Sequence, residues 1–231
     1  MLRSHATISD QLSNAELAIS NSLNDAELKA LLAPYGYNDE MLAEGKQRYD
    51  TARAAVSAQE DATGAQQAAT KTLLATQEQA EAAYQNLAKM ARAVIPDSTV
   101  LTRLGLGGRM PRAIGDFLAA AGTLFDNTAN IPELSKYGYD AAKLAAERAK
   151  ISAYSTANQN QETAKTVAKA ATVAQDAALA ALAKWMAQYI KVARIALSAQ
   201  PEMLGRLGVT ARTGPTAAQR AARKKTPPAT A

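Results

Sequence analysis

The stretch from Asp140 to Gln200 contains neither glycine nor proline. These two residues mark most turns and helix ends, so a long interval without them favours continuous helix over several short elements. Alanine dominates the stretch, with Gln, Glu and Lys scattered through it, and this composition has a high intrinsic helix propensity. Few β-branched residues occur in succession anywhere in the chain. The sequence therefore predicts an all-α protein.

Apolar residues recur every seven positions towards the ends of two long segments, which indicates helices that pack along their length as in a coiled coil. In the middle of each segment the same positions are polar, and we expect them to set the register of packing. The apolar positions include Leu42, Tyr49, Tyr84, Leu87, Ile151, Tyr154, Leu182 and Tyr189, with Gly45 and Ala52 in the same columns; the polar ones include Gln59, Thr63, Gln66, Thr70, Asn158, Gln161, Lys165 and Thr172.

Two architectures fit this pattern. Each segment can be one helix of about 57 residues, roughly 85 Å long, giving a pair of long helices. Alternatively, a turn near Asp61-Ala62-Thr63-Gly64 and its counterpart can fold each segment into a hairpin, giving a four-helix bundle. The unbroken heptad register and the missing turn residues after Asp140 favour the long helices.

Several short motifs occur twice in the same order, which indicates an internal duplication. We interpret the chain as two homologous helical units, residues 1–107 and 108–210, that pack on each other as one domain, followed by a tail at 211–231. The paired motifs are Tyr35-Gly36-Tyr37 with Tyr137-Gly138-Tyr139, Lys89-Met90-Ala91-Arg92 with Lys191-Val192-Ala193-Arg194, and Arg103-Leu104-Gly105-Leu106 with Arg206-Leu207-Gly208-Val209.

The repeated motifs have the chemistry of helix ends. Each Tyr-Gly-Tyr is followed by a good N-cap residue, Asn38 or Asp140, and its second tyrosine has the spacing of a hydrophobic staple. Gly105 and Gly208 suit the left-handed position that follows a helix in a Schellman motif. We also expect shorter helices beside the ends of the long ones: two within residues 8–33, broken near Asn24-Asp25, and one amphipathic helix over residues 112–126.

The chain offers little of the chemistry that enzymes and metal sites need. It has no cysteine and one histidine, His5, which excludes disulfides, thiol nucleophiles, zinc fingers and iron–sulfur sites. The glycines in 104–109 follow an expected helix rather than a strand, so we interpret them as a connector and not as a phosphate-binding loop. We predict no catalytic, cofactor-binding or metal-binding residue and no small-molecule substrate, and therefore a protein that is not an enzyme.

The formal net charge of +5 is confined to the last thirty residues or so. Residues 1–202 hold 20 of the 26 basic residues and all 21 acidic ones, a net charge of −1. The tail is rich in Ala, Thr and Pro and is expected to be disordered alone. Its cations could bind nucleic acid or another polyanion through salt-sensitive electrostatics: Arg212, Arg220, Arg223, Lys224 and Lys225.

These observations favour a structural or protein-interaction scaffold that self-associates through alanine-rich helices, with a second copy or another helical protein as partner. Polyanion binding by the tail is one alternative. Membrane binding by residues 112–126 is another, although Asp116 and Asp126 lie within that segment. No segment has the roughly 20 consecutive apolar residues of a membrane span, the first residues lack the apolar core of a secretory signal, and we expect a cytoplasmic protein.

Overall fold

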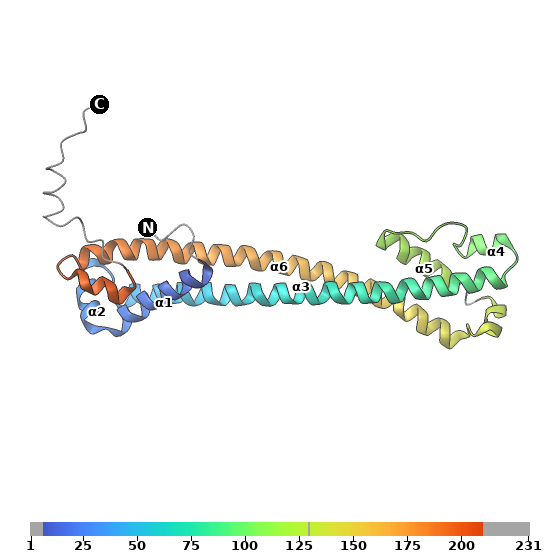
Figure 1. Ribbon diagram of the computed structural model, residues 1–231, viewed down its shortest axis with the longest axis horizontal. Coiled ribbons are helices and arrows are strands. Elements are labelled where there is room, and N and C mark those ends of the chain that lie inside the picture. Colours follow the sequence, from blue (N-terminus) through green and yellow to red (C-terminus); the bar gives the residue numbers. More distant parts are fainter. Residues whose placement is uncertain (1–6, 129, 210–231) are drawn as a thin grey trace, which may run out of the picture. The chain divides into compact units, whose positions relative to one another are not determined.

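The computed structural model describes residues 7–128 and 130–209, and every regular element in those ranges is a helix (Figure 1), which confirms the predicted all-α class. In chain order the elements are α1 (Ile8–Asn24), α2 (Ala26–Leu32), the 3₁₀ helix η1 (Ala33–Tyr35), α3 (Asp39–Val94), α4 (Ser98–Arg103), α5 (Ile114–Thr128), the 3₁₀ helix η2 (Pro132–Tyr137), α6 (Ala141–Ala196) and the 3₁₀ helix η3 (Pro201–Leu207).

The two long segments are single helices. Helices α3 and α6 each contain 56 residues, and both ribbons run without a break in Figure 1. The hairpin alternative is therefore wrong. Gly64, where that alternative placed a turn, lies inside α3, because one glycine costs a helix only about 1 kcal/mol and the residues around it are strong helix formers.

The predicted N-caps are confirmed. The side chain of Asn38 accepts a hydrogen bond from the backbone N–H of Met41 at 3.0 Å, and that of Asp140 accepts one from Lys143 at 2.8 Å. The predicted break near residue 25 is also present, since Asp25 caps α2. These short polar side chains satisfy N–H groups that the first turn of a helix leaves without partners.

The left-handed conformation predicted for Gly105 and Gly208 is confirmed, and Gly36 and Gly138 adopt it too. Positive φ angles occur at Gly36 (87°), Gly105 (75°), Gly138 (84°) and Gly208 (68°), and at no other described residue. The backbone N–H that follows each of them closes a Schellman bond, for example from Leu106 to the Leu101 carbonyl at 2.9 Å and from Val209 to the Leu204 carbonyl at 3.1 Å. Each Tyr-Gly-Tyr motif thus ends one helix just before the next begins.

The described residues form two compact units. Unit 1 contains residues 7–58 and 173–209, and unit 2 contains the described residues of 59–172. Each unit therefore combines one end of α3 with one end of α6. These units do not coincide with the two halves predicted from the sequence, which meet at 107/108. The predicted halves concern an internal duplication, and that duplication stays a prediction.

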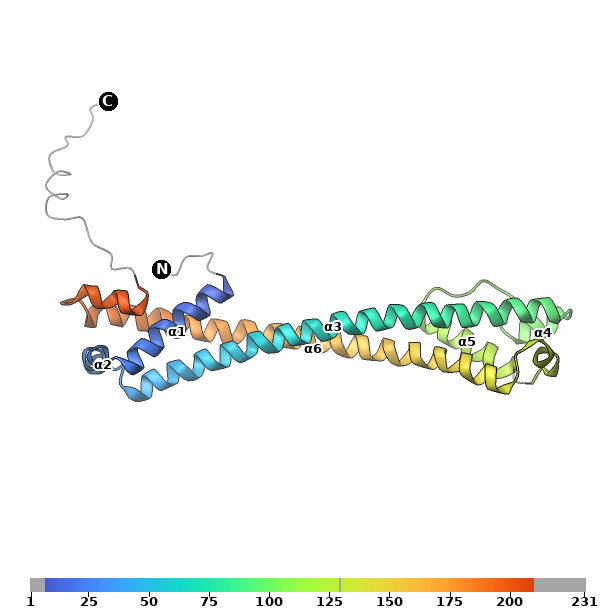
Figure 2. The same cartoon turned by 60° about the horizontal axis from the view of Figure 1, so that its bottom comes forward.

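In unit 1, α1 and α2 cover the start of α3 and the end of α6, together with η3. Figure 2 shows α1 and α2 beside the first turns of α3. The docking of these short helices beside the long ones confirms the expectation for residues 8–33. The buried core includes Ile19, Leu28, Leu32, Leu42, Trp185, Tyr189, Leu197 and Leu207.

In unit 2, α5 packs its apolar face against the end of α3 and the start of α6. The Phe117 ring lies 5.7 Å from the Tyr84 ring and 5.9 Å from the Tyr154 ring, centroid to centroid, in edge-on geometry. Leu124 and Phe125 are buried beside them. The predicted amphipathic face of residues 112–126 is confirmed, and the core of unit 2 covers it.

Some of the polar heptad positions in the middle of α6 are buried at the packed face and others are exposed. Gln161 is buried, at seven residues from both Tyr154 and Ala168, which are buried too. Lys165 is exposed instead, and its ammonium group pairs with Glu162 at 2.9 Å. The heptad pattern thus continues through the polar centre with small and amide side chains at the packed face.

Candidate functional site

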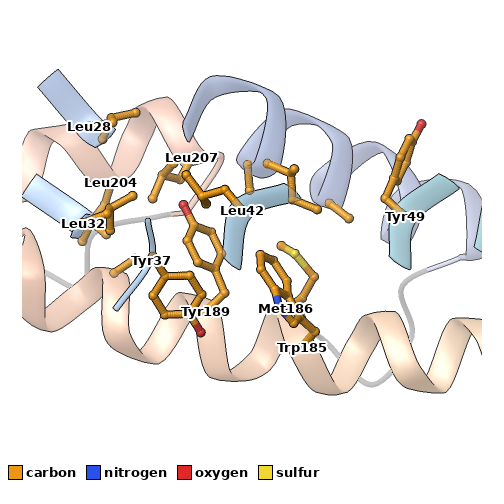
Figure 3. Close-up of a cluster of buried hydrophobic side chains, with 14 of the residues drawn as sticks. Leu28, Leu32, Tyr37, Leu42, Tyr49, Trp185, Met186, Tyr189, Leu204 and Leu207 are labelled. Atoms are coloured by element: carbon orange, nitrogen blue, oxygen red, sulfur yellow. The ribbon is translucent and has the colours of Figure 1, made fainter. Parts of the chain in front are cut away.

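An aromatic cluster occupies the centre of unit 1. Tyr37, from the turn before α3, meets Trp185 and Tyr189 of α6 (Figure 3). The Trp185 and Tyr189 rings stack with centroids 5.2 Å apart and planes at 16°, and Tyr37 meets both edge-on at 5.8 and 5.0 Å. Such pairs stabilise a core by about 0.5–1.5 kcal/mol each beyond the area they bury.

The side chain of Tyr189 is buried, and its hydroxyl forms a hydrogen bond with Ser22 of α1. The Ser22 hydroxyl donates to the Ala18 carbonyl at 2.8 Å, so the Tyr189 hydroxyl donates to the Ser22 oxygen. Burial raises the pKa of Tyr189 to about 12. This phenol therefore stays protonated at neutral pH and acts as a structural donor.

Trp185 has two unusual features, a ring nitrogen left unpaired by the described residues and a close contact with a glycine of α3. Its Nε1 is buried and has no hydrogen-bond partner among the described residues. Its six-membered ring lies against the backbone of Gly45 in α3, where a Cβ would come within 2.5 Å of Cζ2 and 2.8 Å of Cζ3. Gly45 is thus the place where α3 approaches the indole of α6 too closely for any side chain.

Each unit also contains a polar corner at which an asparagine near the end of a helix binds the carbonyl of an arginine. In unit 1, Asn21 of α1 donates to the Arg206 carbonyl at 2.5 Å. In unit 2, Asn127 of α5 donates to the Arg103 carbonyl at 3.0 Å. The next residue of each helix, Ser22 or Thr128, is buried and donates to the carbonyl four residues before it.

The two corners differ in what binds the arginine side chain. The Arg206 guanidinium pairs with Asp25 at 2.7 Å and with Glu27 at 3.3 Å, and the hydrogen bond from Arg206 lowers the pKa of Asp25. Arg103 forms no ion pair with any residue in 7–128 or 130–209. Both corners border surface hollows, of about 460 Å³ in unit 1 and about 660 Å³ in unit 2.

The residues singled out in the sequence fall into three groups. Gly36, Gly105, Gly138 and Gly208 hold the helix ends. Of the flanking tyrosines, Tyr37 is buried in the aromatic cluster, Tyr139 is half-buried, and Tyr35 and Tyr137 are about half exposed. The proposed polyanion-binding residues all lie outside the described residues, as does His5: Arg212, Arg220, Arg223, Lys224 and Lys225.

Two searches of the described residues bear on chemistry and membranes. No three His, Cys, Asp or Glu side chains in 7–128 and 130–209 gather into a group that could hold a metal ion. None of the helices in the same ranges combines the length and the hydropathy that crossing a bilayer requires.

The chain matches no family model, no curated protein and no solved structure.

Proposed function

We propose that this protein is a non-catalytic helical scaffold that associates with a second copy of itself, and that its two halves, residues 1–107 and 108–210, arose by duplication. The observation that supports the proposal is the shared contact between the halves. In both units an asparagine near the end of the first helix of one half donates a hydrogen bond to the arginine carbonyl in the Arg-Leu-Gly end of the other half.

The helix bounds support the same proposal. Helices α3 and α6 have the same length, follow the same Tyr-Gly-Tyr turn, and begin after an Asn or Asp cap. Helices α1 and α5 share the pattern Ile-x-Asp-x-Leu at their start, at Ile8 and Ile114, and carry the paired asparagines near their end, at Asn21 and Asn127. Two halves that share their first helix and their long helix can form equivalent contacts with each other.

Exchange of halves is the route to self-association that these contacts favour. Each unit needs segments from both halves, so the first half of one chain can complete its units with the second half of another chain. Residues 104–113 join the halves and include Gly105, Gly107, Gly108 and Pro111. This connector would extend in the exchanged form, and no new interface chemistry would be required.

Light scattering after size exclusion, across a range of protein concentrations, tests the proposal. We expect a population of dimers that grows with concentration and grows further when residues 107–110 are deleted, because a short connector favours exchange. A variant with four Gly or Ser residues inserted at the same place is the matched control and should shift the population towards monomer. A chain that is monomeric at every concentration in all three forms would refute self-association.

A cross-link distinguishes exchange from association through an outer surface. The chain has no cysteine, so the variant Asp25→Cys with Arg206→Cys places two thiols where an ion pair now joins the two halves in unit 1. A short bis-maleimide should link them within one chain in the monomer and between two chains in an exchanged dimer. A dimer that yields only internally linked chains would refute exchange of halves.

Polyanion binding through the tail is a second proposal, supported by the charge distribution. Residues 1–202 are nearly neutral, and the excess positive charge follows them. Deleting residues 211–231 should abolish any binding of DNA or RNA that weakens as salt is added. Binding that survives the deletion would place the site in the helical part of the chain instead.

A further inference from the structure

The pocket of about 660 Å³ in unit 2 is lined by polar and apolar groups in similar measure and contains one cation, Arg103, that forms no ion pair within residues 7–128 and 130–209. The carboxylate on which Arg103 acts at longer range is that of Asp97, whose pKa is lowered by hydrogen bonds from Thr99 and, more weakly, by the charge of Arg103. Ile95, Val100 and Ile131 line the sides of the pocket, where the end of α3, α4 and the segment after α5 meet. Arg103, Asn127 and Glu133 supply polar groups. Its volume lies within the range of about 300–1,000 Å³ that is usual for small-molecule sites.

The matching corner of unit 1 indicates what such an arginine binds. There the backbone of Arg206 is held by Asn21, and its guanidinium takes the carboxylates of Asp25 and Glu27. In unit 2, Asn127 holds the backbone of Arg103 in the same way. In both units, therefore, the arginine side chain extends from a backbone that an asparagine holds in place.

The two corners differ at the position that supplies the closest carboxylate to the arginine in unit 1. Aligning Asn21 with Asn127 aligns Asp25 with Ile131 and Glu27 with Glu133. The carboxylate that binds Arg206 most closely is thus replaced by an apolar side chain that lines the pocket. Glu133 lines the pocket too, but its carboxylate is not within ion-pair distance of Arg103.

We propose that this pocket binds a small ligand with an apolar body and a single carboxylate. The ligand carboxylate binds the guanidinium of Arg103 as the Asp25 carboxylate binds that of Arg206. Two parallel N–H donors of a guanidinium match the two oxygens of a carboxylate. Ile95, Val100 and Ile131 contact the apolar body. Glu133 repels a second negative charge, so the pocket selects monocarboxylates over dicarboxylates.

Calorimetric titration of the full chain tests this with octanoate as the probe, octanol as its uncharged analogue and suberate as its dicarboxylate analogue. We expect octanoate to bind at least about tenfold more tightly than octanol, because a charged hydrogen bond to Arg103 contributes that much. Suberate should bind more weakly than octanoate. Glu133→Gln should remove most of that difference.

Arg103→Ala and Arg206→Ala form a matched pair of variants. Arg103→Ala should weaken octanoate about tenfold or more and leave octanol unchanged, whereas Arg206→Ala should leave octanoate binding intact. Far-UV circular dichroism checks that both variants keep their helices. The proposal is wrong if octanoate does not bind at millimolar concentration, if octanol binds equally well, or if both arginine variants have the same effect.

Discussion

Gly45 and Gly64 lie in the same helix, and the structure predicts that alanine has opposite effects at the two positions. A Cβ at Gly64 would have open space around it. A Cβ at Gly45 would come within 3.0 Å of three atoms of the Trp185 ring. We therefore expect Gly64→Ala to stabilise the protein and Gly45→Ala to destabilise it.

The magnitudes follow from helix propensity and from the aromatic cluster. Alanine in place of an unobstructed helical glycine stabilises by up to about 1 kcal/mol. At Gly45 the same gain is opposed by the clash, which either strains the core by about 1–3 kcal/mol or turns Trp185 away from Tyr37 and Tyr189. Losing those two ring contacts would cost about 1–3 kcal/mol together. Because both variants gain the same helix propensity, they should differ by the cost of the clash, about 1–3 kcal/mol.

Urea unfolding followed by far-UV circular dichroism measures both variants, and fluorescence adds a local probe because Trp185 is the only tryptophan. Gly45→Ala should alter the emission of the native protein, whereas Gly64→Ala should not. Trp185→Phe shortens the ring that meets position 45, so it should reduce the cost of Gly45→Ala in a double-mutant cycle. If Gly45→Ala is as stable as Gly64→Ala, the close packing of α3 on Trp185 is refuted.

Three further predictions concern single groups. Ser22→Ala should cost about 1–3 kcal/mol because it leaves the buried Tyr189 hydroxyl unpaired, and Ser22→Ala with Tyr189→Phe should cost less than the two single changes added together, as urea titrations of the cycle would show. Hydrogen bonds, first from Lys143, lower the pKa of Glu147; the stability this contributes is present above about pH 4.5 and is lost as the pH falls further, so Glu147→Gln should lose less stability than the wild type between about pH 7 and about pH 3. Gly138→Ala should lower stability by about 1–2 kcal/mol through its φ of 84° alone, since no atom lies near its Cβ position, and thermal unfolding would measure the loss.

The local structure could be predicted from the sequence because its signals are local. Asn38 and Asp140 bind N–H groups three residues away, and Gly105 and Gly208 act within one turn of their helices. The missing turn residues after Asp140 likewise predicted one long helix. Each of these interactions depends on neighbours in the chain, so composition and spacing were sufficient.

The contacts between distant segments could not be predicted in the same way. Gly45 occupied a packing column in the heptad pattern, but nothing near it in the sequence points to Trp185. The Asn21 and Asn127 corners were missed because α2 has only a shorter 3₁₀ counterpart in the second half, which shifts the alignment between α1 and α5. A search for repeats that allowed this shift would have paired the two asparagines, although not their arginine partners.

The composition of the two units also sets an order of events during synthesis. Unit 2 is drawn from one contiguous part of the chain, residues 59–172, whereas unit 1 joins residues near both ends. Unit 2 can therefore be complete while the ribosome is still adding the end of α6. The apolar faces of α1, α2 and the first turns of α3 stay uncovered until Trp185, Tyr189 and Leu207 have been synthesised, and during that interval they are exposed to aggregation.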